Sequence, residues 1–266
     1  MPAIDHDSDL AVQAEKLSGA VRAAGDIALK FFRADVRSWN KGNASPVSEA
    51  DIAVDEFLRE RLADTDIAWL SEETEDDPTR LQMRRVWVID PIDGTRGYIA
   101  GKPDWSISAA LVEDGRPVVG ALFAPATDDF YLAVAGEGAT LNGKPITANG
   151  GDSLAAMRVA GPLSAAERLP ADTVIVPKIH SLALRIAKTA NGALDAAFAG
   201  GNSHDWDLAA ADLLVHEAGG TLTDVRGRIL TYNCPEPVHS PLIAAGLQRH
   251  AALMARFEMA RFEKGR

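Results

Sequence analysis

The sequence predicts a mixed α/β fold in which α-helices are layered with two β-sheets. Three observations lead to this prediction: amphipathic helical segments at both ends of the chain, hairpin-connected strands in the middle, and alternating short strands and helices after residue 150. With 266 residues, of which 47% are hydrophobic, the chain can bury a large core in one big domain or in two modest ones.

The first half of the chain is predicted to begin with two helices and to continue as a mostly antiparallel sheet. Apolar residues recur at helical spacing in the helices, and a polar loop separates them. The pairs Asp114-Gly115 and Asn142-Gly143 are hairpin signals, so a meander is expected between residues 105 and 148. The expected elements are helices at 8–33 and 50–63 and strands at 67–70, 86–89, 107–112, 118–123 and 130–134.

The composition changes near Asn149-Gly150-Gly151-Asp152, which is the best candidate for a boundary. We therefore expect an N-terminal part, residues 1–150, and a C-terminal part, residues 151–266, with a mixed sheet in the second. Gly219-Gly220 is a typical helix stop. The expected elements are strands at 158–160, 173–176, 196–199, 221–224 and 242–245 and helices at 165–168, 182–189, 207–218 and 249–264.

Composition also narrows the class of protein. Acidic residues exceed basic ones, 38 against 27, and the net charge of −11 leaves no basic face for nucleic acid. Cys234 is the single cysteine, so no internal disulfide can form and a cytoplasmic location is expected. No apolar run reaches the length of about 18 residues that a membrane span requires, and the acidic N-terminus does not resemble a signal peptide.

The most informative stretch is VWVIDPIDGT at residues 86–95, which contains Asp90 and Asp93. Because proline cannot continue a central strand, we expect the strand to stop at Ile89 and both carboxylates to emerge together. Carboxylates held close repel each other unless a cation lies between them, and Mg²⁺ is the usual cation of an all-oxygen cluster. The backbone N–H groups of Gly94 and Thr95 would form an anion cradle beside it. A metal next to an anion cradle indicates phosphate chemistry.

Three more acidic elements lie at strand ends or helix starts. Glu72 and Glu73 follow a short apolar strand, Asp207 opens a helix, and Asp51 follows a polar loop. Each acid alone is explained more simply as a turn residue, a helix cap or surface charge. Four such elements together with the Gly-Thr cradle favour a metal site.

These segments resemble a known family. The stretch at 86–95, the stretch WDLAAA at 206–211 and the stretch EAGG at 217–220 are similar to the signature of the inositol monophosphatase family. The similarity extends to KGNASPVSEAD at 41–51 and GEGA at 136–139, and so covers about residues 8–250. The resemblance implies a layered αβαβα sandwich of the sugar-phosphatase type, a homodimer, and a lithium-sensitive, Mg²⁺-dependent phosphatase for a small phosphorylated substrate.

The resemblance also implies a role for each motif residue. Two to three Mg²⁺ ions are expected. The first would be bound by Glu72, Asp90 and the carbonyl of Ile92, the second by Asp90, Asp93 and Asp207, and a weaker third by Glu72 through waters, with Glu73 nearby. Asp51 and Thr95 would orient or deprotonate the attacking water. The substrate would be contacted by the amides of Gly94 and Thr95, by Arg96 and by Asp207.

The substrate has to be inferred from positions at which the chain departs from the branches of the family. Arg96 follows the Asp-Gly-Thr motif where inositol-type enzymes have a neutral residue, and Gly200 replaces a glutamate expected seven residues before Asp207. Both favour a 3′(2′),5′-bisphosphate nucleotidase acting on adenosine 3′,5′-bisphosphate. Asn43, Gly97 and His180 depart from the patterns of that branch or of the family. Inositol-1-phosphate phosphatase and histidinol-phosphate phosphatase stay open, as does a non-enzymatic regulatory protein of the same fold.

Overall fold

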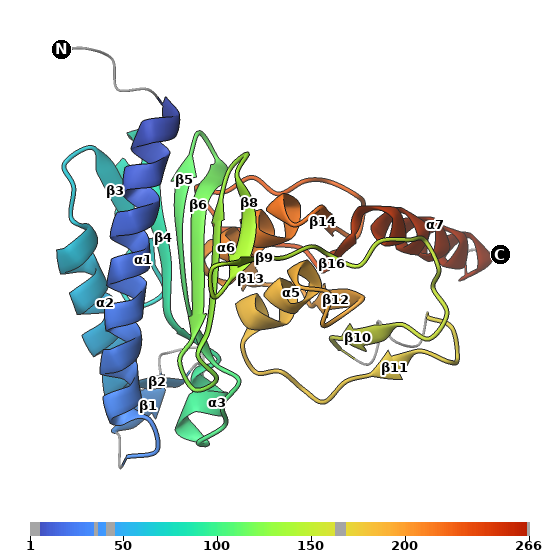
Figure 1. Cartoon of the computed structure of the whole chain (residues 1–266), viewed down its shortest axis with the longest axis horizontal. Helices are drawn as coiled ribbons and strands as arrows, with labels where there is room; N and C mark the ends of the chain where they lie inside the picture. Colours follow the sequence, from blue (N-terminus) through green and yellow to red (C-terminus); the bar gives the residue numbers. More distant parts are fainter. Residues whose placement is uncertain (1–5, 35–36, 41–45, 163–168, 265–266) are drawn as a thin grey trace.

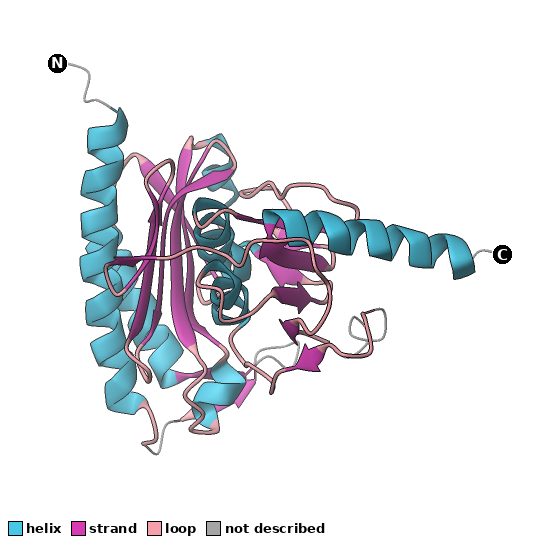
Figure 2. Ribbon diagram, turned by 45° about the vertical axis from the view of Figure 1, so that its right-hand side comes forward, coloured by secondary structure: helices cyan, strands magenta, loops and turns pink. Residues whose placement is uncertain are grey.

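The computed structural model describes residues 6–34, 37–40, 46–162 and 169–264 of the chain. They form five layers in the order helix, sheet, helix, sheet, helix (Figure 1). Figure 2 shows the paired outer helices on one side and a single long helix on the other. The αβαβα sandwich expected from the sequence is therefore confirmed.

The first helical layer consists of α1 (His6–Phe31) and α2 (Glu49–Leu62), close to the predicted bounds. The apolar positions of α1, such as Leu17 and Val21, are fully buried against the first sheet. Between the helices, β1 (Ser38–Asn40) and β2 (Pro46–Ser48) form an antiparallel pair where we expected a polar loop. That expectation was wrong because β1 is exposed along its whole length and so carries no apolar alternation.

The first sheet has seven strands in sequential order, and only β3 and β4 are parallel. The predicted hairpins are confirmed, because both residues of Asp114-Gly115 and of Asn142-Gly143 have positive φ angles. The strands are β3 (Ile67–Ser71), β4 (Arg85–Asp93), β5 (Ser106–Glu113), β6 (Arg116–Ala124), β7 (Asp129–Val134), β8 (Gly138–Leu141) and β9 (Lys144–Pro145).

Strand β4 does not stop at Ile89 but continues through Pro91 to Asp93. Its partner β3 ends where Ser71 pairs with Ile89, so no neighbour on that side needs an N–H from Pro91. On the other side Asp90 pairs with Ser108 and Asp93 with Ser106, which gives β4 one extra residue. The expected strand end is thus a β-bulge, which tolerates proline and redirects the two aspartates.

The second sheet is mixed, as predicted, with the order β11-β10-β12-β16-β14. Helices α5 (Leu182–Ala190) and α6 (Asp205–Glu217) lie between the two sheets, and α7 (Leu247–Lys264) covers the outer face (Figure 1). The strands are β10 (Arg158–Ala160), β11 (Val174–Ile175), β12 (Ala196–Ala199), β14 (Gly220–Asp224) and β16 (Leu242–Gly246). Smaller elements are η1 (Pro78–Gln82), α3 (Thr95–Ile99), β13 (Ser203–His204) and β15 (Val238–His239). The helix expected at 165–168 lies outside the described residues.

The central core joins both halves of the chain. Leu122 of β6, Leu184 of α5 and Leu208 of α6 belong to one buried cluster that also includes Leu242 of β16. The close approach of α6 to β6 depends on Gly120, where an added Cβ would lie 3.1 Å from the backbone of Ala210. The division at residue 150 stays a prediction. Within the described ranges, no helix is long and apolar enough to cross a membrane.

Two glycines of α1 allow a matched test of this packing. Gly25→Ala should destabilise the protein by about 1–3 kcal/mol, because the new Cβ would lie 2.3 Å from the ring of Phe123. Gly19→Ala should instead stabilise it by up to about 1 kcal/mol, because that position is open and alanine favours the helix. Urea unfolding of both variants measures the difference in the free energy of unfolding. Equal changes in the two variants would contradict the packing of α1 at Gly25 against Phe123.

Candidate active site

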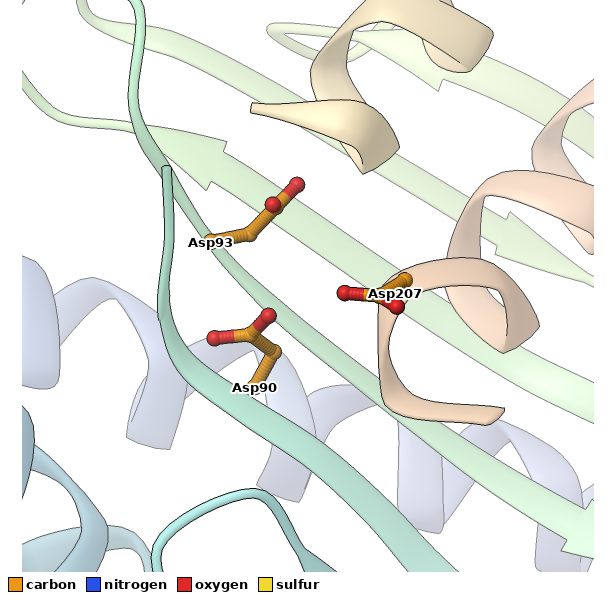
Figure 3. Close-up of side chains that lie close together, drawn as sticks. All are labelled: Asp90, Asp93 and Asp207. Carbon is orange, nitrogen blue, oxygen red and sulfur yellow. The ribbon is translucent and has the colours of Figure 1, made fainter. Parts of the chain in front are cut away.

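Three aspartates, two of them buried (Asp90 and Asp93) and one half-buried (Asp207), meet at the end of β4 and the beginning of α6. Figure 3 shows Asp90 and Asp93 on β4 facing Asp207 on the first turn of α6. One oxygen from each of the three lies within 4.8 Å of the others. The bulge at Pro91 and the N-terminus of α6 thus bring together carboxylates that are more than 100 positions apart in the chain.

Asp90 has the environment expected of a metal ligand. Its side chain is 1% exposed, and its Oδ1 atom has no hydrogen-bond partner. Burial raises the pKa of Asp90 well above its usual value, and the charges of Glu72 and Asp93 raise it further. A buried, unpaired carboxylate oxygen is costly in an empty site, whereas a hard divalent cation would satisfy it. The donor set therefore fits a metal such as Mg²⁺.

Asp93 is held by the N-terminus of α5. Its carboxylate accepts hydrogen bonds from Ser181 Oγ at 2.6 Å, from Leu182 N at 3.1 Å and from Ala183 N at 2.6 Å. Burial raises the pKa of Asp93, and the three hydrogen bonds oppose that shift. The positive end of α5 thus compensates part of the negative charge of the cluster.

Asp207 is the third residue of α6 and takes part in its N-terminal cap. Its Oδ2 atom accepts a hydrogen bond from His204 N at 2.6 Å. Burial, with a further contribution from the charge of Asp93, raises the pKa of Asp207 to about 7. The ring of His204 stacks on Trp206, with centroids 4.6 Å apart. The capping role and a ligand role are therefore compatible in one residue.

Asp51 and Thr95 form a hydrogen-bonded pair. Thr95 Oγ1 lies 3.1 Å from Asp51 Oδ1 and 3.0 Å from the carbonyl oxygen of Ile92. Asp51 also accepts a hydrogen bond from Ser48 N at 2.9 Å at the start of α2. Burial raises the pKa of Asp51, while the hydrogen bonds from Ser48 and Thr95 lower it. The structure thus places together the two residues that the sequence assigned to the attacking water.

Glu72 and Glu73 directly follow β3, beside the end of β4. Glu72 N donates to the carbonyl of Ile89, and among neighbouring charges that of Glu72 contributes most to the raised pKa of Asp90. The segment is fastened by Asp55 of α2, whose carboxylate accepts hydrogen bonds from Ser71 Oγ and, at 2.6 Å, from Thr74 Oγ1. Sequence reasoning missed Asp55, although its position one turn after Asp51 puts both on one face of the helix.

Gly94 forms the turn between β4 and α3. Its φ angle is +93°, and an added Cβ would lie 2.9 Å from Ser181 N, so the backbone conformation and the space both require glycine. Thr95 begins α3, so the amides of Gly94 and Thr95 lie next to Asp93. Arg96 projects from α3 as an exposed side chain.

A cavity of about 460 Å³ is lined by Arg185 of α5, Lys178 and Gly200, among others. Arg185 is half-buried, its buried Nε atom has no hydrogen-bond partner, and its charge interacts with those of Asp93 and Asp207. Burial lowers the pKa of Arg185. Sequence reasoning missed this residue; an arginine between Leu184 and Ile186 in a strongly apolar helix was the available signal.

Comparison with known proteins agrees with this geometry. The sequence model of the inositol monophosphatase family matches residues 9–259. The chain belongs to the inositol monophosphatase family. The 3′(2′),5′-bisphosphate nucleotidase CysQ of Aggregatibacter actinomycetemcomitans is 33% identical over 84% of this chain and 88% of its own. The Nus factor SuhB of Haemophilus influenzae is 31% identical over 77% and 82%. The structure of an IMPase of Thermotoga maritima superimposes with a TM-score of 0.80 at 25% identity, covering 94% and 98%.

The inositol monophosphatase family is a family of Mg²⁺-dependent phosphatases, and the acidic cluster can hold such an ion. The relatives carry different names, so membership alone does not identify a substrate.

Asp90→Asn should separate metal binding from stability. In EDTA we expect the variant to melt about 2–4 °C higher than the wild type, because one of the charges that repel each other is removed. This corresponds to a gain of roughly 1 kcal/mol in the free energy of unfolding. With saturating Mg²⁺ the wild type should gain stability and the variant should not. Calorimetric melting measures both effects.

Asp212→Asn is the matched control, because Asp212 is another buried acid of α6 that lies outside the cluster and accepts a hydrogen bond from Tyr232. It should keep the Mg²⁺ response. An Asp90→Asn protein that is stabilised by Mg²⁺ as much as the wild type would contradict the assignment of the cluster as the metal site.

Proposed function

We propose that this protein hydrolyses a small phosphate monoester with Mg²⁺, and that its preferred substrate is a nucleoside 3′,5′-bisphosphate from which it removes the 3′-phosphate. The observation that supports this most is the aspartate cluster, in which the buried Asp90 has one oxygen without a hydrogen-bond partner, next to the Asp51–Thr95 pair. The half-buried Arg185, which lines a cavity and whose charge interacts with those of Asp93 and Asp207, supports the choice of substrate.

The ligands we assign to Mg²⁺ are Glu72, Asp90, the carbonyl oxygen of Ile92, Asp93 and Asp207, for two to three ions. When bound, Mg²⁺ would lower the pKa of a coordinated water and neutralise charge on the leaving oxygen. The carboxylates would otherwise repel a phosphate dianion, so the cluster can accept the substrate only after cations have offset its charge. This order would account for an anion cradle directly beside the metal ligands.

Asp51 and Thr95 are proposed to orient the attacking water and to take its proton. The Thr95 hydroxyl lies between the Asp51 carboxylate and the Ile92 carbonyl, so it can donate its proton to either, and a lone pair of its oxygen would then accept a hydrogen bond from the attacking water. Burial raises the pKa of Asp51, which brings this carboxylate closer to the range in which it can act as a general base. The amides of Gly94 and Thr95 would hold the phosphate.

Arg185 is proposed to bind the second phosphate. A guanidinium with a buried, unpartnered Nε atom gains most from a charged, hydrogen-bonding partner. Lys178 adds a second cation to the same cavity, and Gly200 leaves space because an added Cβ there would meet nothing within 4 Å. A neutral polyol such as inositol would leave Arg185 without such a partner. The expected contact of exposed Arg96 with substrate stays a prediction.

Inositol 1-phosphate and histidinol phosphate are the competing substrates, and a regulatory protein without hydrolytic activity is the competing class. The similarity to a Nus factor is relevant to that class. The complete pairing of Asp51 with Thr95 beside the acidic cluster favours an enzyme. A homodimer, a cytoplasmic location and the absence of nucleic-acid binding stay predictions.

With Mg²⁺, kcat/KM for adenosine 3′,5′-bisphosphate should exceed that for inositol 1-phosphate by at least about tenfold, or roughly 1.4 kcal/mol. Arg185→Met should lower kcat/KM for the bisphosphate by about 10–100-fold, because a charge-assisted hydrogen bond is lost. It should have little effect on p-nitrophenyl phosphate, which has one phosphate. Steady-state kinetics over this small panel measure all three values.

Lys188→Met is the control, because it removes a cation from the same helix without changing the cavity lining. Faster hydrolysis of inositol 1-phosphate or histidinol phosphate would refute the substrate assignment and leave the phosphatase assignment intact. Absence of hydrolysis with every ester, in a protein that binds Mg²⁺, would favour the regulatory class.

Thr95→Ala and Asp51→Asn should each lower kcat by about 10²-fold or more while changing KM little, because both residues act on water in the transition state. The double variant should be hardly worse than either single variant, since the two residues work as one unit. Multiplying losses in the double-mutant cycle would show that they act separately.

A further inference from the structure

Gly97, Asp104 and His180 are in contact with one another beside the turn at Gly94, and we call these three residues the interlock. One oxygen of Asp104, Oδ2, accepts a hydrogen bond from His180 N at 2.6 Å and lies 2.7 Å from His180 Nδ1. The backbone oxygen of Asp104 accepts another from Ser181 N at 3.0 Å. Asp104 therefore binds two successive residues immediately before α5 through both its side chain and its backbone.

Gly97 provides the space for the imidazole ring. A Cβ at this position would lie 2.7 Å from both Cβ and Cγ of His180, so any side chain there would displace the ring. In the sequence, Gly97 and His180 are two independent departures from the residues common in the family or its nucleotidase branch. In the structure they are one packing unit, because the absence of a side chain at the first makes room for the second.

The interlock holds residues 180–183, which contact both the turn at Gly94 and the carboxylate of Asp93. The backbone at His180 and Ser181 packs against Gly94, where a Cβ would lie 3.2 Å from the His180 carbonyl carbon. Ser181, Leu182 and Ala183 of the same segment each donate a hydrogen bond to the buried Asp93 carboxylate. Ser181 Oγ is also fixed by Ser106 Oγ at 2.9 Å and by Leu184 N at 2.8 Å.

We infer that His180 and Asp104 are positioning residues, which hold the N-terminus of α5 at the distance from β4 that orients Asp93 for a divalent cation. Hydrogen bonds weaken steeply with distance and angle, so a small shift of this segment would release Asp93 to other orientations. The inference rests on the metal site of the proposed function but not on the substrate. Outer partners of metal ligands commonly contribute 10–100-fold to metal affinity.

The test uses Mn²⁺ as the probe, with the electron paramagnetic resonance signal of the free ion reporting how much is bound. His180→Ala, Asp104→Ala and Gly97→Ala should each weaken Mn²⁺ binding at least about tenfold. The double variant of His180→Ala with Asp104→Ala should bind about as weakly as either single variant. His180→Asn should largely restore binding, because the asparagine amide can donate to Asp104 in place of Nδ1–H.

Two controls separate positioning from general stability. His250→Ala removes a different histidine, which is buried and bonded to Thr223 in the second sheet, and should lower the melting temperature without changing Mn²⁺ affinity. Gly19→Ala adds a methyl group in open space and should change neither binding nor fold.

Unchanged Mn²⁺ affinity in the three alanine variants, whatever their melting temperatures, would overturn the inference. So would a rise in KM alone, which would make His180 a substrate contact. A wild-type protein that binds no Mn²⁺ would overturn both this inference and the proposed metal site, whereas normal Mn²⁺ binding without hydrolysis would refute only the proposed function.

Discussion

The close approach of three carboxylates, two of them buried and one half-buried, is the constraint on which the rest of this molecule depends. Burial raises the pKa of all three, the charges of Asp93 and Asp207 raise that of Asp90 further, and the charge of Asp93 raises that of Asp207. Such an arrangement is unfavourable without a cation and is tolerated only where the surrounding structure is firm. The five-layer sandwich supplies that firmness, because both elements that carry the aspartates pack in the central core.

Helix N-termini stabilise the carboxylates of this site in three places. Asp51 and Asp207 are each the third residue of a helix, and each accepts a hydrogen bond from the backbone N–H of the residue that precedes the helix. Asp93 is not part of α5 but accepts hydrogen bonds from its first backbone N–H groups. Each contact places a carboxylate at the positive end of a helix dipole, which offsets part of the repulsion. Asp51 and Asp207 are therefore helix caps and candidate site residues at the same time, and the two interpretations do not exclude each other.

Around the cluster, a second set of contacts connects the parts of the site. Asp55 fastens the segment of Glu72 to α2, and Asp104 fastens the start of α5 to the loop after α3. Arg185 links the aspartates to the neighbouring cavity through its charge. The site is consequently built from α2, β3, β4, α5 and α6 at one edge of the first sheet, where rigid elements rather than long loops set its geometry.

The sequence by itself determined the helices and most strands, since their apolar periodicity and hairpin signals are local. It also determined the family, through the motifs around Asp90 and Asp207. It did not reveal that β4 passes through Pro91, because that depends on where β3 ends. Nor did it reveal Arg185, Asp55 or the seat of His180 on Gly97, which come from segments far apart in the chain. Only the tertiary structure decided these, because burial and partners across layers, rather than residue type, make a side chain part of a site.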